Sequence, residues 1–432
     1  MRRVLVAVDL VVVGLGYVGL PLAQAACQSG LRVVGLDLKP EIVTGLNAAT
    51  SHVDDLSGKD IQTMLDQGFV ATSDASILSD ADTVVICVPT PLSKDGGPDL
   101  GAVLGATRSI AAHLHAGQLI VLESTTYPGT TDEDVRPILE AGGLVAGVDF
   151  NLAFSPERID PGNPVYGMTN TPKVVGGHTA QCTERAAAFY EKFVDTVVKA
   201  AGTREAEMAK LIENTYRHVN IAMVNELAQF AHLLNVDLWD AIRCASSKPF
   251  GFQAFYPGPG VGGHCIPIDP NYLSHRIKTV VGQPFRFVEL AQEINAGMPE
   301  YVKRRAQDLL NDHRKAIHGS RVLLVGVTYK ANIADERESP VRPLARTLLA
   351  AGAEVSYHDE FVGQWNIDSE HGHHEGDRVL TSEADVYTAA AAADLVILLQ
   401  NHRGYDLAKL QSSAKVILDT RGLLSGANVD RL

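Results

Sequence analysis

The N-terminal third of the chain alternates short apolar runs with helix-like stretches. The run Val11–Val13 leads into a glycine turn, a helix-like stretch from Leu20 to Ala26, and a second apolar run that ends at Asp37. Three further runs cover residues 82–88, 119–123 and 150–154. Each is long enough for a buried strand and too short for a buried helix. Strands that alternate with helices predict an α/β fold built on a parallel sheet.

The middle of the chain follows a helical period instead. From about residue 203 to residue 234, apolar side chains recur at the spacing of one helix face; they are Met208, Leu211, Ile212, Val219, Met223, Leu227 and Phe230. A helix of this length is expected to join two domains and to pair with a second subunit. Its opposite side carries the polar residues Lys210, Asn214 and Arg217, a pattern that fits either a solvated surface or a functional face. A second helical stretch covers residues 287–310.

A second α/β unit begins near Ser320. Apolar runs at 321–327, 353–359, 395–399 and 415–419 predict strands, the last of which closes the unit, and residues 340–351 predict a helix. This part has no full glycine fingerprint. The expected architecture is therefore α/β, with two Rossmann-like parallel-sheet domains joined by a long central helical region. The predicted boundaries are 1–200, 201–312 and 313–432.

The turn after the first strand has the spacing of a dinucleotide site. Its glycines are Gly14, Gly16 and Gly19, with Tyr17 and Val18 between the last two. The first glycine permits a tight turn, the second lets a pyrophosphate approach bare backbone, and the third lets helix and strand pack closely. Asp37, about 20 residues further on, is placed to bind the ribose hydroxyls and to repel a 2′-phosphate. The pattern predicts NAD as cofactor.

Composition excludes several classes of partner. The chain of 432 residues is 46% hydrophobic and has a formal net charge of −14. That charge disfavours nucleic acid and anionic membranes, which both need clustered cations. Met1–Val8 resembles the start of a signal peptide, but Asp9 interrupts it, and no run approaches a membrane span. The five scattered cysteines favour a reduced, cytoplasmic protein.

No metal is predicted. The stretch from His371 to Glu375 is histidine-rich, but it lies among loop residues and no second ligand cluster supports it.

The run from Pro257 to Asp269 indicates nucleophilic chemistry. Cys265 follows Gly262, Gly263 and His264, and glycine neighbours let a ligand come close to a thiol. A carboxylate four residues later, Asp269, can handle a proton or a water molecule. A cysteine in such a place can also be a plain core residue.

Polar side chains follow the predicted strands of the first sheet. They are Thr90, Thr125, Glu157 and Arg158. Ligands of parallel sheets bind beyond the carboxyl ends of the strands, so these residues fall where cofactor and substrate would meet.

Taken in order, these motifs resemble the UDP-glucose/GDP-mannose dehydrogenase family along nearly the whole chain. The matching segments are Gly14–Gly19, Val88–Pro91, Ser124–Thr125, Ser155–Arg158, Lys210 with Asn214, Gly262–Cys265 with Asp269, Gly326–Lys330, Asp335–Ser339 and Asp419–Arg421. The resemblance implies a dehydrogenase that oxidises the C6 alcohol of a UDP-sugar to a carboxylate with two NAD and one water.

The resemblance also implies a role for each matching residue. Cys265 would form a thiohemiacetal and then a thioester. Lys210 would act as a base or as an electrostatic partner of the C6 oxygen, and Asn214 would donate a hydrogen bond to the same oxygen. The hydrolytic water would be activated or ordered by Asp269, with help from Glu157 and Thr125. The cations expected to hold the UDP-sugar are Arg158, Arg217, Lys330 and Arg421, with Gly262, Phe255 and Tyr256 lining the sugar site. Arg337 is expected to face the cofactor.

The substrate is expected to be UDP-N-acetylglucosamine, whose uronic acid enters surface polysaccharide. Residues 123–130, 248–252 and 255–260 are similar to the branch of the family acting on that sugar, and its acetamido group could lie against Phe252, Phe255 and Tyr256. A His-Pro-Arg segment typical of the UDP-N-acetylmannosamine branch is absent, and the chain lacks the second glutamate of the UDP-glucose branch. Both sugars remain alternatives, as does a catalytically silent NAD-binding sensor. A single-step alcohol dehydrogenase would not need the cysteine.

Overall fold

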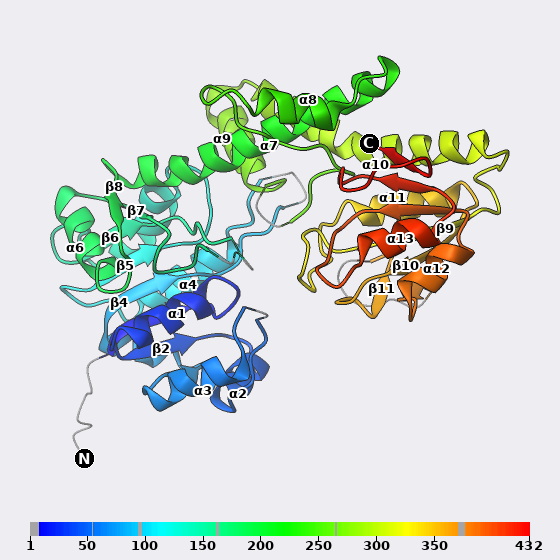
Figure 1. Ribbon diagram of the computed structural model, residues 1–432. Coiled ribbons are helices and arrows are strands. Elements are labelled where there is room, and N and C mark those ends of the chain that lie inside the picture. Colours follow the sequence, from blue (N-terminus) through cyan, green and yellow to red (C-terminus); the bar gives the residue numbers. More distant parts are fainter. Residues whose placement is uncertain are drawn as a thin grey trace. The chain divides into compact units, whose positions relative to one another are not determined.

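The computed structural model describes residues 8–53, 55–93, 97–160, 163, 165–263, 266–369 and 376–432. The chain divides into two compact units (Figure 1). The first comprises Met1–Glu213 and Asn271–Gly282, and the second comprises Asn214–Pro270 and Gln283–Leu432.

The first unit is built on a sheet of eight strands. Their order is β3-β2-β1-β4-β5-β6-β7-β8, and only the pair β6 and β7 is antiparallel. The bounds are β1 Val8–Val13, β2 Val33–Leu36, β3 Val70–Thr72, β4 Ala81–Ile86, β5 Leu119–Leu122, β6 Asn151–Phe154, β7 Lys173–Gly177 and β8 Val197–Lys199. The predicted parallel α/β sheet is confirmed, while β3, β7 and β8 were not predicted. Among the described residues one strand precedes the glycine turn.

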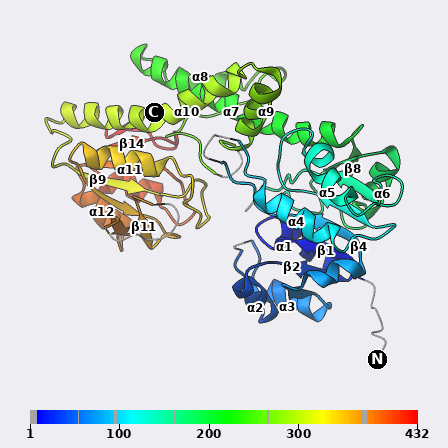
Figure 2. The ribbon, with the colours of Figure 1, turned by 180° about the vertical axis from the view of Figure 1, so that it is seen from behind.

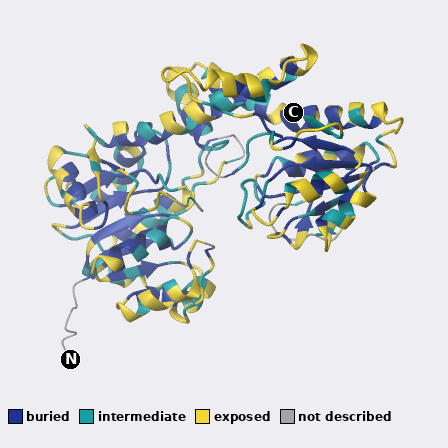
Figure 3. Cartoon of the chain, viewed as in Figure 1, coloured by how far each residue is buried: buried dark blue, intermediate teal, exposed yellow. Residues whose placement is uncertain are grey.

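Helices cover both faces of this sheet. They are α1 Gly19–Gln28, α2 Pro40–Asn47, α3 Gly58–Asp66, α4 Gly101–Ala111, α5 Arg136–Glu140 and α6 Ala180–Tyr190, with the short turns η1 Ala75–Asp80 and η2 Thr130–Val135. Successive residues of β1 belong to different cores, since Leu10 and Val12 join one cluster and Val11 and Val13 the other. The continuous apolar strand runs are therefore explained by burial on both faces, and Figure 3 shows these strands in the buried colour.

The helical middle region contains α7 Thr203–Leu233, α8 Leu238–Ala245, α9 Asp269–Val281 and α10 Arg286–Asp312. The predicted apolar stripe of α7 is largely on its exposed side, where Met223, Leu227 and Phe230 are each about half exposed. The polar residues His218 and Asn225 are instead buried against α10. Helical periodicity identified the helix correctly but did not tell which face meets this chain's own core.

The second unit contains a parallel sheet of five strands in the order β10-β9-β13-β14-β15. Their bounds are β9 Arg321–Val325, β10 Glu354–His358, β13 Leu395–Leu398, β14 Ile417–Asp419 and β15 Val429–Arg431, and β11 Gln364–Asn366 pairs with β12 Val379–Thr381 as a separate ribbon. Helix α11 Val341–Ala350 packs with α10 on one face, and α12 Val386–Ala392 and α13 Leu407–Ser413 cover the other (Figure 2). The prediction that residues 415–419 form the last strand was wrong, because β15 adds a further edge.

Candidate active site

The three glycines after β1 have the three geometries that a dinucleotide loop needs. Gly14 has φ +92°, a left-handed conformation that disfavours other residues, and a side chain at Gly19 would collide with the Gly14 carbonyl. A Cβ added at Gly16 would meet no heavy atom within 4 Å. Gly16 therefore leaves its backbone open, three residues before α1 begins, where a pyrophosphate would bind. Tyr17 and Val18 follow directly, and Tyr17 is 40% exposed.

Asp37 lies just past β2 and braces this turn. Its Oδ2 accepts a hydrogen bond from the Leu15 backbone N–H at 2.9 Å, and its Oδ1 accepts from Lys39 N–H at 2.9 Å. Each carboxylate oxygen can accept a further bond from a ribose hydroxyl. The glycine turn and Asp37 together fit NAD.

The loops after β4 and β5 are joined by the predicted cofactor residues. The hydroxyl of Thr90 donates to the Thr125 carbonyl at 2.8 Å, and Ser124 donates to the Val88 carbonyl at 2.7 Å. The Thr90 carbonyl also accepts from the hydroxyl of Tyr272 on α9. Thr90 and Thr125 are thus neighbours at the carboxyl edge of the sheet, as expected for parallel strands.

Lys210 and Glu157 are brought together in the first unit. The ammonium of Lys210 donates to the main-chain carbonyl of Glu157 at 2.5 Å, and Lys210 is only 8% exposed. Glu157 Oε1 accepts from the backbone N–H of Ile159 at 2.5 Å. A solvated surface is therefore the wrong interpretation for Lys210, since its side chain is buried. The bond to Glu157 fits this burial, because a lysine is almost never buried without polar partners. Arg217, further along the same helix, is exposed.

Arg158 faces an acidic partner. Its Nη2 lies 2.7 Å from Glu213 Oε1, and its Nη1 donates to the Pro172 carbonyl at 2.8 Å. Its predicted contact with the UDP-sugar would require sharing or exchanging these bonds.

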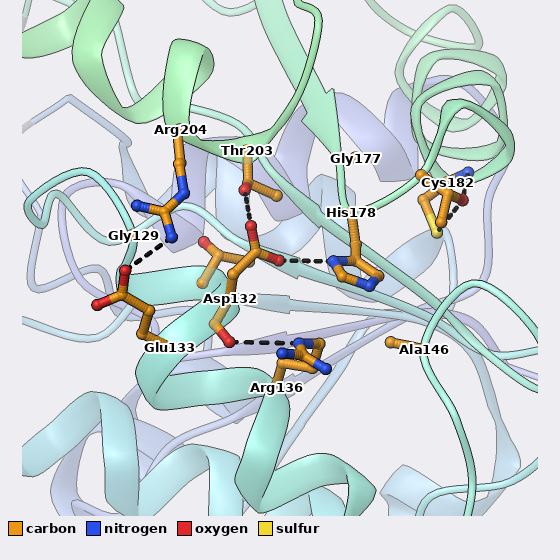
Figure 4. A network of polar contacts seen from close by, with 12 residues as sticks. Gly129, Asp132, Glu133, Arg136, Ala146, Gly177, His178, Cys182, Thr203 and Arg204 are labelled. Carbon is orange, nitrogen blue, oxygen red and sulfur yellow. Dashed lines mark hydrogen bonds and ion pairs between the residues drawn. The ribbon is translucent and has the colours of Figure 1, made fainter.

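A network of charged side chains fixes the start of α7 to the first sheet (Figure 4). Asp132 of η2 accepts from the Thr203 hydroxyl at 2.6 Å and lies 2.7 Å from Nδ1 of His178. The neighbouring Glu133 pairs with Arg204 at 2.7 Å. These bonds hold the first turn of α7, which carries Lys210 two turns later, against η2.

Glu207 adds a buried carboxylate to this junction. It accepts from the backbone N–H of Gly129 at 2.6 Å and of Thr131 at 2.9 Å, and the Thr131 hydroxyl also donates to it. The pKa of Glu207 is raised to about 7, because the effect of burial outweighs that of these hydrogen bonds, which lower the pKa. Sequence reasoning missed Glu207, since nothing in its spacing distinguishes it from the exposed glutamates of the same helix.

In the second unit, Asn214 contacts Asp269. The Asn214 amide donates to Asp269 Oδ2 at 2.6 Å, and Asp269, the first residue of α9, is 2% exposed. Asn214 follows Lys210 by one turn of α7. Asp269 therefore contacts Asn214, which belongs with Lys210 to one motif of the sequence. His264 and Cys265 lie outside the described residues, so the role of Cys265 stays a prediction.

The glycines before Cys265 are explained by close packing. A Cβ at Gly262 would lie 2.7 Å from the Glu338 carbonyl and 2.8 Å from Tyr329 Cβ, and Gly263 has φ +91°. The side of Gly262 on which a side chain would stand is thus filled by protein. Asn225, which the sequence did not single out, holds the same loop by accepting from Gly258 N–H at 2.9 Å.

The two aromatic residues predicted to line the sugar site have ring partners. Phe255 meets Tyr216 edge-on at 5.7 Å, and Tyr256 stacks on Trp239 at 5.6 Å with a 12° angle between the rings. Both rings are held by residues of the same unit, which fixes their orientation.

The second sheet repeats the construction of the first at its strand ends. Gly326 has φ +81°, and Asp359 past β10 accepts from the Val327 N–H at 2.7 Å, as Asp37 does from Leu15. Here, however, Nε2 of His402 also lies 3.0 Å from Asp359 Oδ2, the oxygen that accepts from Val327. This carboxylate is enclosed by protein, so the second sheet does not offer a dinucleotide site of the first kind.

The predicted nucleotide cations follow strands of this second sheet. Lys330 is in the loop after β9, and Arg421 is two residues past β14. Arg421 donates from Nε to the Leu399 carbonyl at 2.5 Å, and burial lowers its pKa to about 10, so it remains charged at neutral pH. Arg337 pairs with Asp335 through two bonds of 2.9 Å. Nothing in this geometry assigns Arg337 to a cofactor. The histidine-rich stretch from His371 to Glu375 lies outside the described residues.

Family models match the chain in three consecutive blocks. They are described as the NAD binding domain, the central domain and the UDP binding domain of the UDP-glucose/GDP-mannose dehydrogenase family, and they cover residues 8–194, 204–297 and 323–426. The chain belongs to this family. It is an NAD-dependent nucleotide-sugar dehydrogenase, an oxidoreductase that acts on a CH–OH group, and it has a UDP-binding domain.

Family members of several sugar specificities are similar to this chain. UDP-N-acetyl-D-mannosamine dehydrogenase of Methanocaldococcus jannaschii is 32% identical, over 96% of this chain and 92% of that protein. UDP-N-acetyl-D-glucosamine 6-dehydrogenase of Pseudomonas aeruginosa is 34% identical, over 84% and 85%. Among solved structures, UDP-D-ManNAc dehydrogenase of Pyrococcus horikoshii has a TM-score of 0.86 at 29% identity and covers 98% of each chain. Across the described ranges, no helix of this family member is long and apolar enough to cross a membrane.

Proposed function

We propose that the protein is a UDP-N-acetylglucosamine 6-dehydrogenase that oxidises the C6 alcohol to a carboxylate in two steps. The observation that carries the proposal is the placement of Lys210 against the Glu157 carbonyl and of Asn214, one turn later, against Asp269. An ammonium and an amide are groups that can stabilise an alkoxide, and a carboxylate can take up a proton from a hydrolytic water.

In the proposed mechanism NAD, when bound, accepts a hydride from C6 in each of the two oxidations. The Lys210 ammonium and the Asn214 amide stabilise the C6 oxygen as it loses its proton. The Cys265 thiolate adds to the aldehyde carbon, and the resulting thiohemiacetal is oxidised to a thioester. Water then attacks the thioester carbon, the C–S bond breaks, and Asp269 and Glu157 orient the water and take up its proton. Overall, one alcohol, two NAD and one water give one carboxylate, two NADH and three protons.

The preference for N-acetylglucosamine rests on residues 123–130, 248–252 and 255–260, which include Phe252, Phe255 and Tyr256. Ring partners hold Phe255 and Tyr256 rigidly, which suits a wall for an acetamido group. UDP-N-acetylmannosamine is the second candidate. Relatives from Methanocaldococcus jannaschii and Pyrococcus horikoshii, which carry that sugar in their names, favour it.

A substrate panel tests this proposal. Purified protein with NAD should release two NADH per UDP-N-acetylglucosamine oxidised. Its kcat/KM should exceed that for UDP-N-acetylmannosamine by about tenfold or more, because selectivity between such sugars rests on few contacts. UDP-glucose, which lacks the acetamido group, should be poorer still. A higher kcat/KM for UDP-N-acetylmannosamine would replace the leading substrate by the second candidate, and one NADH per sugar would refute the two-step route.

We also propose a homodimer through the exposed apolar face of α7. Tyr216, Met223, Leu227 and Phe230 of α7 and Leu234, the residue after it, repeat at spacings of seven, four, three and four residues, and all are between 44% and 71% exposed. An apolar stripe of this length with heptad-like spacing is typical of a helix that packs on another helix.

A double substitution tests the dimer. Met223→Glu with Leu227→Glu should raise the dimer dissociation constant by about 10²-fold or more, since burying two charges costs several kcal/mol. Size-exclusion chromatography with light scattering measures the mass, and circular dichroism checks the fold. Glu226→Gln, an exposed position of the same helix outside the stripe, should stay dimeric. A wild-type protein that runs as a monomer would contradict the assignment.

A further inference from the structure

A buried cluster of three charged residues lies at one edge of the first sheet. Lys173 begins β7, Glu123 follows β5 and Glu157 follows β6. Nζ of Lys173 lies 3.0 Å from Glu123 Oε2 and 3.5 Å from Glu157 Oε2. All three residues are at most 6% exposed. One ammonium therefore serves two carboxylates away from solvent.

The two carboxylates are held unequally. Glu123 receives a hydrogen bond from Lys173 and another from the hydroxyl of Tyr190. Glu157 Oε2, in contrast, is buried and has no hydrogen-bond partner among the described residues. Its interaction with the Lys173 ammonium is therefore an ion pair without a hydrogen bond. Burial by itself would lower the pKa of Lys173, but Glu123 and Glu157 raise it above its ordinary value. The ammonium thus stays charged.

A purely structural ion pair would not need this arrangement. Glu123 alone would neutralise Lys173, and a second buried carboxylate adds a desolvation cost. Glu157 also lends its main-chain carbonyl to Lys210, so a shift of Glu157 would disturb the Lys210 ammonium as well. The cluster connects a framework of β5, β7 and α6 to two residues of the candidate site.

We propose that Lys173, fixed by Glu123 and Tyr190, is a positioning residue that holds the Glu157 carboxylate for thioester hydrolysis. The inference rests on the proposed function. In that step the oxygen of water bonds to the thioester carbon, the C–S bond breaks, and sulfur leaves with the bonding electron pair. The proton of the water passes to Glu157 through an ordered water. Lys173 touches neither substrate nor cofactor in this scheme.

The test is rapid-mixing kinetics of Lys173→Met in the full-length protein with UDP-N-acetylglucosamine and NAD. The variant should show a burst of two NADH per active site, followed by a steady-state rate about 10²-fold below that of the wild type, the lower range for loss of general base catalysis. KM for the UDP-sugar should change little. Mass spectrometry of acid-quenched protein should detect the acyl group on Cys265. Lys199→Met, which removes a surface lysine paired with Glu184, should behave as the wild type.

A double variant separates positioning from stability. If the ion pair only stabilises the fold, Glu123→Gln with Lys173→Met removes both charges and should restore the wild-type rate. If Lys173 positions Glu157, the burst and the slow hydrolysis persist in the double variant, which also decides the matter should the single variant not fold. Restored turnover, or no burst in either variant, would overturn the inference. Failure of the proposed function differs, because the wild type itself would then not yield two NADH per sugar.

Discussion

Cys265→Ser should stop the protein from completing the four-electron oxidation. Serine has a far weaker nucleophile and cannot form a thioester, so formation of the carboxylate should fall by about 10³-fold or more, as losses of a catalytic nucleophile commonly do. The first oxidation does not use the thiol. The variant should therefore stall after or within the second oxidation, with at most one NADH per bound sugar in a single turnover.

Absorbance of NADH in a single-turnover experiment, together with chromatography of the sugar product, measures this outcome. Cys244→Ser is a matched control, because Cys244 is an exposed thiol on α8 with no predicted role. It should keep the wild-type yield of two NADH. Full activity of Cys265→Ser would refute the covalent route and leave Asp269 and Glu157 without a thioester to hydrolyse.

Lys210→Met should lower kcat by about 10²-fold to 10³-fold, the usual cost of removing one preorganised donor from a developing oxyanion. The structure gives the reason why the loss should be large. The ammonium is nearly enclosed and is aimed by its bond to the Glu157 carbonyl, so it needs little reorganisation during the reaction. Because a methionine fills much the same volume without charge, the variant should fold.

Steady-state kinetics with added methylamine provide the sharpest check. A second variant, Lys210→Ala, leaves room for a small amine, which should restore part of its activity, whereas a lysine with only a structural role would not be replaced by an amine in solution. Glu205→Gln, an exposed position in the first turn of α7, should leave kcat unchanged. Wild-type kcat in Lys210→Met would remove this residue from the catalytic set.

The second unit illustrates how far local patterns reach. Its strands were predicted from apolar runs, and four of the five were found because buried parallel strands are uniformly apolar. The fifth, β15 (Val429–Arg431), is short and only partly buried, with a polar middle residue, so no apolar run marks it. Likewise, the spacing of α7 predicted its length well, but an apolar face can meet either this chain's own core or a partner, and the period is the same in both cases.

What the sequence by itself determined is the set of local geometries and the order of motifs. Gly14 with positive φ, an unobstructed Gly16 and a tightly packed Gly19 follow from the absence of a side chain, and three family domains follow from motif order. Only the tertiary structure decided which carboxylates and ammonium groups are buried together. Glu123 and Glu157 follow the ends of the parallel strands β5 and β6, and Lys173 begins β7, which runs antiparallel to β6. This strand arrangement brings the three charged side chains to one edge of the sheet, although many residues separate them in the sequence.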